Sequence, residues 1–268
     1  MGEKVHELAI VGAGNMAEAI ARGVLAAKLF SADQISAADP VAQRRELFTS
    51  QLGIQTTEAP STNAKIILLS VKPQQMESAL SALRAHKRDD TRFISIAAGI
   101  RTSTIEKAIG GGRVVRAMPN TPMLVGEGMT AICPGSTATS DDLEMARRLF
   151  QCAGKVVEVE ESQMEAVTAV SGSGPAYVYY LAEHMIAAGV TLGLSQEQAA
   201  LLARQTIAGA GRMLATSADS PQELRRKVTS PGGTTQAAIE TLDQLRTSDA
   251  IQHAIVAAEK RGKELGAK

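Results

Sequence analysis

A glycine-rich turn between two apolar segments lies near the start of the chain. The apolar run Leu8 to Val11 leads into Gly12-Ala13-Gly14, and an amphipathic helical pattern begins at Asn15. In such a strand–turn–helix, the first glycine permits a tight turn, and the second lets a pyrophosphate approach the backbone N–H groups at the helix start. The third small position is Ala17, which still allows close packing. A cofactor site is therefore favoured over a chance glycine turn, and its predicted contacts are Gly12, Ala13, Gly14, Asn15 and Met16.

A second glycine-rich turn, Ser230-Pro-Gly-Gly-Thr-Thr235, precedes a helical pattern over residues 236–245. Gly232 and Gly233 shape a turn whose N–H groups point at one spot, and Thr234 and Thr235 add hydroxyls at a helix N-terminus. Such a turn suits a small carboxylate. The alternative, from this stretch alone, is a threonine N-cap after a glycine loop.

Asp39 and two arginines follow the second predicted strand, residues 35–38. In a dinucleotide-binding fold, an acidic residue here hydrogen-bonds the adenosine ribose and favours NAD, whereas a nearby arginine accepts the 2′-phosphate of NADP. Arg44 and Arg45 stand in that second position. The two signals conflict. The alternative is that Asp39 only begins a turn with Pro40 and that the arginines face water.

Two further predicted strands end in candidate cofactor contacts. The apolar run 65–71 has the composition of a central buried strand, and it ends in Val71-Lys72-Pro73. Lys72 is placed to meet a phosphate, or else it is an exposed lysine beside a strand-ending proline. The strand 93–99 ends in Ala97-Ala98-Gly99, where small residues let a flat ring approach the backbone.

Asn120 lies between two prolines, directly after a predicted strand over residues 113–118. Pro119 and Pro122 hold it in a stiff loop, and an amide side chain at a strand end can read a carboxamide or orient a substrate. The alternative is an ordinary turn built from favoured turn residues.

Strand and helix patterns alternate as far as residue 160, and helical patterns follow. Alternating strands and helices predict a parallel α/β sheet. Ser103 with Glu106 predicts a capping box at the start of one helix of this first part. We therefore expect domains at 1–160 and 161–268. The second is rich in small apolar residues and poor in aromatics, so we expect a partner chain to complete its core; a compact monomeric bundle is the alternative.

Composition narrows the function classes. The chain has 268 residues and a net charge of zero, without a basic stripe, which argues against a nucleic-acid partner. Cys133 and Cys152 form neither a disulfide framework nor a metal cluster. No apolar run approaches the roughly 20 residues of a membrane span, and no signal peptide is visible. We expect a cytoplasmic protein without metal or membrane association.

A series of motifs resembles those of the pyrroline-5-carboxylate reductase family and covers nearly the whole chain. In order, the motifs are Gly12-Ala-Gly-Asn-Met-Ala17, Val71-Lys-Pro-Gln74, Ser95-Ile-Ala-Ala-Gly99, Arg116-Ala-Met-Pro-Asn-Thr-Pro122, Ser171-Gly-Ser-Gly-Pro-Ala-Tyr177 and Ser230-Pro-Gly-Gly-Thr-Thr235. The resemblance implies the last step of proline biosynthesis, in which NAD(P)H reduces a cyclic imine to L-proline. It also implies a Rossmann-type dinucleotide-binding domain followed by an all-α dimerisation domain. That domain forms an intertwined homodimer, which in the family is often assembled into a decamer of five dimers.

The resemblance also assigns roles by position. The glycine loop, Val71 to Pro73 and Ala97 to Gly99 contact the cofactor, and Asn120 lies near the nicotinamide. The substrate carboxylate is held by backbone N–H groups and the Thr235 hydroxyl. The implied substrate contacts are Glu161, Ser230, Gly232, Gly233, Thr234 and Thr235.

One departure from the family pattern concerns the choice of cofactor. Family members that contact the adenosine ribose or its phosphate often carry Ser or Thr after the second strand, where this chain has Ala38-Asp39. NADH therefore stays open, with Asp39 as its contact. NADPH is favoured because of Arg44 and Arg45.

Hydride transfer to a cyclic imine does not require a strong general acid, because the imine is partly protonated near neutral pH. Orientation of the reactants then supplies most of the catalysis, and Thr235, which can hydrogen-bond the ring nitrogen, is the predicted catalytic residue. A β-hydroxyacid dehydrogenase of similar build is disfavoured because the helix 177–183 lacks the lysine that such enzymes carry. A reductase of a different imine and a non-enzymatic regulator that binds the cofactor stay open.

Overall fold

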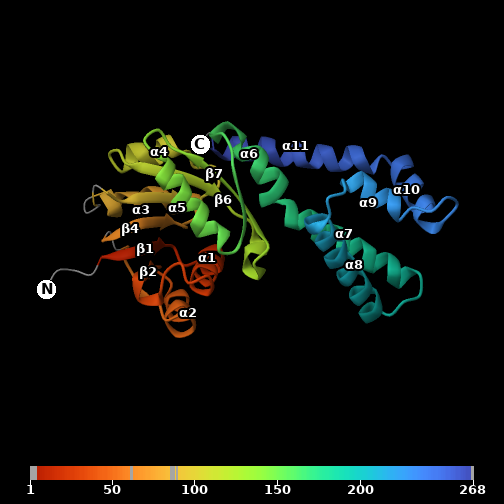
Figure 1. The fold of residues 1–268 in the computed structure, drawn as a ribbon, viewed down its shortest axis with the longest axis horizontal. Coiled ribbons are helices and arrows are strands. Elements are labelled where there is room, and N and C mark those ends of the chain that lie inside the picture. The colour runs from red at the N-terminus through yellow and green to blue at the C-terminus, as the bar shows by residue number, and fades with distance from the viewer. Residues whose placement is uncertain (1–4, 61–62, 85–87, 89, 267–268) are drawn as a thin grey trace. The chain divides into compact units, whose positions relative to one another are not determined.

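The apolar runs of the first half form one eight-stranded sheet in the order β3-β2-β1-β4-β5-β6-β7-β8 (Figure 1). The structure is a computed structural model that describes residues 5–60, 63–84, 88 and 90–266. Every neighbouring pair is parallel except β6 and β7, which are antiparallel. The strands are β1 (His6–Val11), β2 (Ile35–Ala38), β3 (Gln55–Thr57), β4 (Ala64–Leu69), β5 (Arg92–Ser95), β6 (Arg113–Met118), β7 (Gly128–Pro134) and β8 (Gly154–Glu158).

Helices cover both faces of this sheet, as expected for a parallel α/β arrangement. The α-helices are α1 (Asn15–Ala26), α2 (Ala42–Leu52), α3 (Met76–Arg84), α4 (Thr102–Ala108), α5 (Ser140–Gln151), α6 (Met164–Val167), α7 (Gly174–Thr191), α8 (Gln196–Thr216), α9 (Pro221–Lys227), α10 (Thr234–Gln244) and α11 (Thr247–Gly266). Short 3₁₀ turns are η1 (Ala32–Gln34), η2 (Pro73–Gln75), η3 (Thr121–Val125) and η4 (Glu161–Gln163), and η5 (Thr168–Gly172) is a π-helical turn.

Alternate residues of β1 enter different cores. Leu8 and Ile10 pack with α1, α2 and α5, which bury large side chains such as Phe48 and Phe150. Ala9 and Val11 face the opposite way and pack with α3 and α4. Successive strand residues point to opposite faces, so a strand that is apolar throughout must be covered on both sides.

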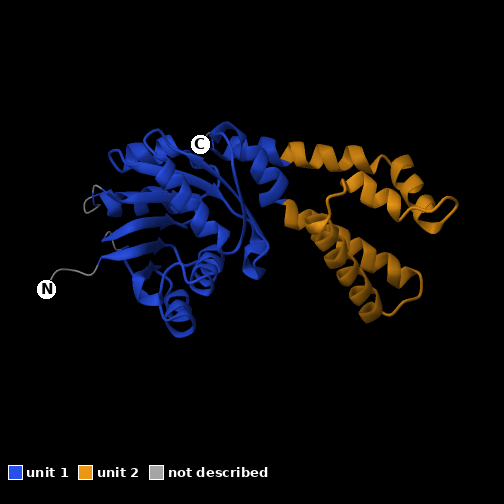
Figure 2. Ribbon diagram, viewed as in Figure 1, with its two compact units in different colours: residues 1–173, 258–268 blue, residues 174–257 orange. Residues whose placement is uncertain are grey.

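The chain divides into two compact units (Figure 2). Unit 1 contains the chain up to Ser173 together with the segment from Ala258 onward, and unit 2 is Gly174–Ala257. The predicted boundary near residue 160 marks where strands give way to helices, which begin here with η4. The packing change comes later, at the start of α7.

Unit 2 is helical and has almost no core of its own. All of residues 174–257 are described, and among them only Ala199 and Ala203 are buried. Large apolar side chains such as Leu201 and Leu242 lie exposed on its helices. A helical unit this open needs further apolar surface to cover it.

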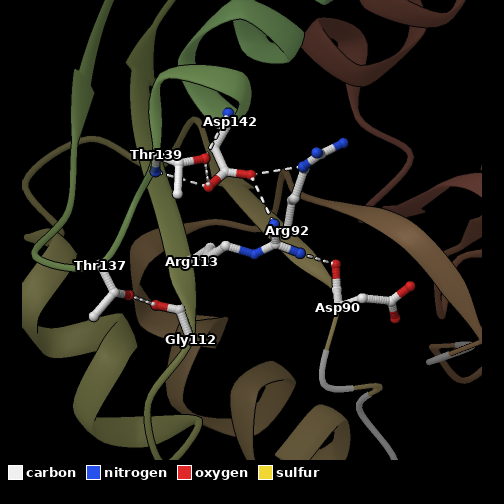
Figure 3. A network of polar contacts seen from close by, with 7 residues as sticks. All are labelled: Asp90, Arg92, Gly112, Arg113, Thr137, Thr139 and Asp142. Atoms are coloured by element: carbon white, nitrogen blue, oxygen red, sulfur yellow. Dashed lines mark hydrogen bonds and ion pairs between the residues drawn. The ribbon is translucent and has the colours of Figure 1, made fainter.

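The amino ends of β5 and β6 are tied to α5 by a buried carboxylate (Figure 3). Asp142 accepts hydrogen bonds from Arg92 Nε at 2.6 Å and from the backbone N–H and hydroxyl of Thr139, the N-cap of α5. Arg113 Nη1 lies 3.4 Å from the same carboxylate, and Arg113 also donates to the Asp90 carbonyl. This network lies at the amino edge of these strands, away from the carboxyl ends where ligands bind in open α/β sheets.

The predicted capping box at Ser103 and Glu106 is wrong. Helix α4 begins at Thr102, with Arg101 as its N-cap and no side-chain cap bond there. Glu106 instead accepts hydrogen bonds from the backbone N–H and the hydroxyl of Ser136, outside the helix. The start of α4 is bonded by Glu161, which is distant in the sequence and could not be identified from local pattern.

Candidate active site

The turn between β1 and α1 has the geometry that its glycines require. Gly12 has φ +95°, and a Cβ there would lie 2.7 Å from the Ser70 carbonyl oxygen, so this position accepts only glycine. Gly14 is the N-cap of α1, where no side chain caps the helix and a Cβ would meet no atom within 4 Å. The N-terminus of α1 is therefore open to an anion.

A cavity of about 560 Å³ lies beside this turn, at the carboxyl ends of β1, β2 and β4. Predicted cofactor residues that line it are Gly12, Gly14, Asp39, Arg44, Val71 and Lys72. Predicted residues outside its lining are Ala13, Asn15, Met16, Pro73, Ala97, Ala98, Gly99 and Asn120. The first group comes from three strand ends that are far apart in the sequence, and the sheet order brings them together.

The Asp39 carboxylate has backbone partners on both oxygens. Ala13 N donates to Oδ2 and Val41 N donates to Oδ1, each at 2.8 Å. Asp39 therefore fixes the glycine loop against the end of β2 and begins a turn, while still lining the cavity. The predicted ribose contact and the alternative turn role are compatible at this residue.

The two arginines differ in their relation to the cavity. Arg44 lines it and donates to the Ala13 carbonyl and to Glu18 Oε2, the latter at 3.0 Å. Burial raises the pKa of Glu18, but hydrogen bonds from Arg22 and Arg44 outweigh burial and leave it lowered, so Glu18 is a charged partner. Arg45 donates instead to the carbonyls of Asp39 and Pro40 and does not line the cavity. Of the pair, only Arg44 lines the cavity.

The small residues after β5 lie against the C-terminal end of α11. Gly99 has φ +75°, and a Cβ on it would approach Gly266 Cα at 3.4 Å. A Cβ on Gly266 would in turn lie 2.9 Å from the Gly99 carbonyl oxygen. These glycines permit a close backbone approach within unit 1, which sequence reasoning about Ala97 to Gly99 did not include.

The Asn120 side chain is buried and has two backbone partners. Its Oδ1 accepts from Met129 N at 2.8 Å, and its Nδ2 donates to the Ser171 carbonyl at 3.1 Å. Asn120 thus joins the end of β6 to β7 and to the π-helical turn η5.

Glu161 takes part in a partly buried ionic cluster. Its carboxylate accepts from the backbone N–H of Thr102 at 2.8 Å and from the Thr102 hydroxyl at 3.0 Å. Arg116, whose side chain is 3% exposed, lies 3.6 Å from Glu161 and 2.9 Å from Glu165. Cys133 lies in the same region, where burial raises the pKa of its thiol to about 12, so it stays protonated. The cluster fastens η4 and α6 to β6, and the predicted contact of Glu161 with substrate stays a prediction.

The second glycine turn leads into α10, which begins at Thr234. Its N-cap is Gly233, without a side-chain cap bond, so neither threonine takes the capping role that the alternative interpretation gave it. Gly232 has φ +70° and open space around its Cα, and the Thr235 side chain is half-buried. The N–H groups at this helix start therefore have the arrangement of an anion site.

Gln236 is a residue of this turn that sequence reasoning missed. Its Oε1 accepts from Gly232 N at 2.7 Å, and its Nε2 donates to Glu240 at 2.7 Å. The available signal was a glutamine at the third position of a helix after a turn, which commonly reaches back to a preceding N–H group. Gln236 holds Gly232 in its left-handed conformation.

Two negative findings concern the described residues. No group of three or more His, Cys, Asp or Glu side chains among them is arranged to hold a metal ion. Within the same residues, no helix combines the length and hydropathy needed to cross a membrane. Cys133 and Cys152 are both free thiols.

Two known protein families match two separate parts of the chain. The family described as pyrroline-5-carboxylate reductase dimerisation matches residues 161–265, and the family described as NADP oxidoreductase coenzyme F420-dependent matches residues 7–99. The first match covers η4 through nearly all of α11, and the second covers β1 through the end of β5.

Full-length relatives share one name. The pyrroline-5-carboxylate reductase of Synechocystis sp. is 39% identical over 98% of this chain and 99% of its own length. The solved structure of the Coxiella burnetii reductase matches with a TM-score of 0.90 at 35% identity and covers 98% of this chain and 99% of that one. The Plasmodium falciparum enzyme, solved with NADP bound, matches with a TM-score of 0.86 at 30% identity and covers 99% and 100%.

The glycine turn at the sheet, the open start of α10 and the full-length relatives point to the same assignment. Relatives above 30% identity span both units, so the match is not limited to the widespread dinucleotide-binding fold. The chain belongs to the pyrroline-5-carboxylate reductase family, whose members use NAD(P)H to reduce 1-pyrroline-5-carboxylate to proline, the final step of proline biosynthesis.

Proposed function

We propose that the two glycine turns bind the two reactants of this reaction, one turn for each. The cofactor site is the cavity beside Gly12 and Gly14, with the pyrophosphate over the start of α1 and Lys72 near a phosphate. The residues fit a dinucleotide because the space in front of Gly14 is open and because two cations, Arg44 and Lys72, line the same cavity. When bound, the reduced nicotinamide supplies the hydride that the imine carbon accepts.

The substrate site in this proposal is the start of α10, and the observation that carries the proposal is that this helix start has no side-chain cap. The backbone N–H groups of Thr234 and Thr235 hold the substrate carboxylate, because the first N–H groups of a helix have no helical acceptor and this helix start has no side-chain cap. Gly232 N and Gly233 N bond Gln236 Oε1 and the Ser230 carbonyl and so hold the turn in shape. The Thr235 hydroxyl donates to or accepts from the ring nitrogen and so orients the imine carbon. Thr235 acts by orientation and not as a strong acid, because the imine is already partly protonated. Ser230 bonds Gly233 N through its carbonyl and shapes the turn.

NADPH is the preferred cofactor in this proposal. Arg44 lines the cavity at the end of β2 and offers a guanidinium to the 2′-phosphate. Asp39 lines the same region and, with both oxygens bonded to backbone N–H groups, can still accept from a ribose hydroxyl, so NADH remains a weaker substrate.

We further propose a homodimer built through the helical segment 161–268, with a decamer of five dimers as its higher assembly. The near absence of buried residues in unit 2 supports a partner chain covering its helices. Both cysteines are free thiols, which supports placing the protein in the reducing cytoplasm. Light scattering of the purified protein gives the number of subunits directly.

The carboxylate site is tested by comparing two substrates that share the ring. The enzyme is assayed with NADPH and either 1-pyrroline-5-carboxylate or 1-pyrroline, which lacks the carboxylate. A site that binds a charged group through N–H donors discriminates strongly against an analogue without that group, and we expect kcat/KM to fall by roughly a thousandfold or more. Equal kcat/KM values would contradict the assignment of the α10 start as the carboxylate site.

A further inference from the structure

A missing backbone donor marks the junction between η5 and α7. In an α-helix the N–H of residue 175 would bond the carbonyl of residue 171. Residue 175 is a proline, which has no N–H, so the Ser171 carbonyl has no donor at that position of the helix. The turn before it is π-helical, with Ser173 N bonded to the Thr168 carbonyl at 2.8 Å.

Asn120 supplies the donor that Pro175 lacks. Its Nδ2 donates to the Ser171 carbonyl at 3.1 Å, while its Oδ1 accepts from Met129 N at 2.8 Å. The Asn120 side chain is 8% exposed and both bonds are partly buried, where an unpaired carbonyl or N–H is costly. One amide therefore pairs two backbone groups that come from different elements.

The close approach of η5 to the end of β6 supports the same role. A Cβ on Gly172 would lie 2.9 Å from Cε, the far end of the flexible Met118 side chain, so η5 lies directly against the end of β6. Asn120 follows Met118 by two residues, and the cavity beside Gly12 and Gly14 does not include it. Its amide faces the turn instead.

We propose that Asn120 is a positioning residue that acts through the Ser171 carbonyl. By replacing the N–H that Pro175 cannot provide, it fixes η5 against the carboxyl end of β6, where α7 begins. This inference rests on the proposed function for its catalytic consequence: turnover falls when the turn loosens, while cofactor affinity stays. If the Asn120 side chain instead contacted the nicotinamide carboxamide, its replacement would lower the affinity for the cofactor first.

A double-mutant cycle between Asn120 and Pro175 tests the proposal. Asn120→Asp keeps an acceptor for Met129 N and puts an oxygen in place of the donor to Ser171. We expect kcat at saturating substrates to fall roughly tenfold, the cost of one unpaired buried polar group, with little change in KM for NADPH. Pro175→Ala restores an N–H to the helix, so the Asn120→Asp/Pro175→Ala protein should keep kcat within about twofold of Pro175→Ala alone.

Pro221→Ala is the matched control for the restored N–H. Pro221 begins α9 after a non-helical stretch, so an N–H there has no helical carbonyl four residues back, whereas Pro175 follows the π-helical turn η5; replacing Pro221 should therefore not rescue Asn120→Asp. Rescue by Pro175→Ala alone supports the proposal. Two results would overturn the proposal: Asn120→Asp lowers kcat equally with and without Pro175→Ala, or it raises KM for NADPH and Pro175→Ala does not rescue it. Either result would favour a direct contact between Asn120 and the cofactor.

The midpoints of thermal unfolding of the same proteins separate this inference from the proposed function. These midpoints report the coupling of Asn120 with Pro175 without any need for turnover. An inactive wild-type protein would therefore refute the proposed function, while the hydrogen bond from Asn120 to the Ser171 carbonyl could still be tested. Coupling in the unfolding midpoint with unchanged kcat would show a purely structural role and would also overturn the proposal. If Asn120→Asp does not fold, folding of the double variant supports the bond, and its failure to fold opposes it.

Discussion

In the proposed function, the Thr235 hydroxyl orients the substrate ring. Removing it by Thr235→Ala leaves the backbone N–H groups of the α10 start in place but removes the group that orients the ring nitrogen. We expect KM for the imine to rise and kcat/KM to fall by about 2–3 kcal/mol of transition-state stabilisation. Thr235→Ser restores a hydroxyl and should recover most of the loss. Steady-state kinetics check this, and unchanged kcat/KM in Thr235→Ala would remove Thr235 from the mechanism.

Gly12 and Gly14 should respond to alanine in opposite ways. Gly14 has φ −71°, which alanine adopts freely, and its Cβ would point into open space, so Gly14→Ala should fold normally. The methyl group would then occupy the approach of the pyrophosphate and weaken NADPH binding about tenfold to a hundredfold. Fluorescence titration with NADPH measures this, and wild-type affinity would show that the pyrophosphate binds elsewhere.

Gly12→Ala is the matched partner of that variant. Its Cβ would collide with the Ser70 carbonyl in a left-handed conformation, so the expected effect is on folding, about 2 kcal/mol of lost stability. A thermal midpoint equal to that of the wild type would contradict the geometry of the turn.

The glycine turns could be predicted at the residue scale because their function depends on local conformation. Asp39 was ambiguous because its partner Ala13 comes from another strand end, and a sequence does not state which strand ends meet. Gln236 was missed because its side chain bonds an N–H group of the preceding loop. The pairing of Asn120 with Ser171 was missed for a related reason, because the carbonyl that Asn120 bonds belongs to another element.

At the scale of elements, the anchoring of α5 through Asp142 should make the stability of unit 1 depend on pH. Burial raises the pKa of Asp142, but hydrogen bonds from Thr139 and Arg92 and the charge of Arg113 outweigh burial and hold it below its usual range (Figure 3). A lowered pKa means that the ionised carboxylate stabilises the fold at neutral pH. That stabilisation begins to be lost as the pH falls below about 4, the unfolded pKa, and continues to be lost through the folded one.

Asp142→Asn removes the titrating group from this network. We expect the variant to be about 2 kcal/mol less stable than wild type at pH 7, with the difference shrinking as the pH falls below about 4. Asp141→Asn, at the exposed neighbouring position, is the control and should change little. Urea unfolding at a series of pH values measures the difference, and one that stays constant with pH would exclude Asp142 as its source.

The antiparallel pairing of β6 with β7 departs from the predicted parallel sheet, although the sequence contained a signal. Strand composition is similar for parallel and antiparallel buried strands, so the residues of β7 do not reveal its direction. The connection between β6 and β7 holds only the short turn η3, and a parallel crossover needs a dozen or more residues, usually with a helix. The edge strand β3 was missed because it is short and polar.

At the scale of the whole molecule, the helices of unit 2 should be stable only with a partner chain. A shallow hollow on α8 is lined by Ala200, Leu201, Arg204 and Ala208, among others, and Leu201 is 69% exposed. Small and apolar side chains at this spacing lie along one helix face and suit a second helix.

Leu201→Glu should therefore weaken the homo-oligomer. A buried charge without a partner is costly at an interface, so we expect a smaller mass at micromolar concentration, whereas Leu201→Met, of similar volume, should keep the native mass. Light scattering after size-exclusion chromatography measures both. An unchanged mass for Leu201→Glu would exclude this face of α8 from the interface.

Reduction of 1-pyrroline-5-carboxylate with NAD(P)H is the activity on which the roles of both glycine turns depend. The direct test is oxidation of NADPH and NADH, side by side, with racemic pyrroline-5-carboxylate and with the product identified. We expect loss of the reduced nicotinamide absorbance, formation of proline, and a higher kcat/KM with NADPH than with NADH. Folded protein that binds NADPH but turns over neither cofactor would contradict this expectation.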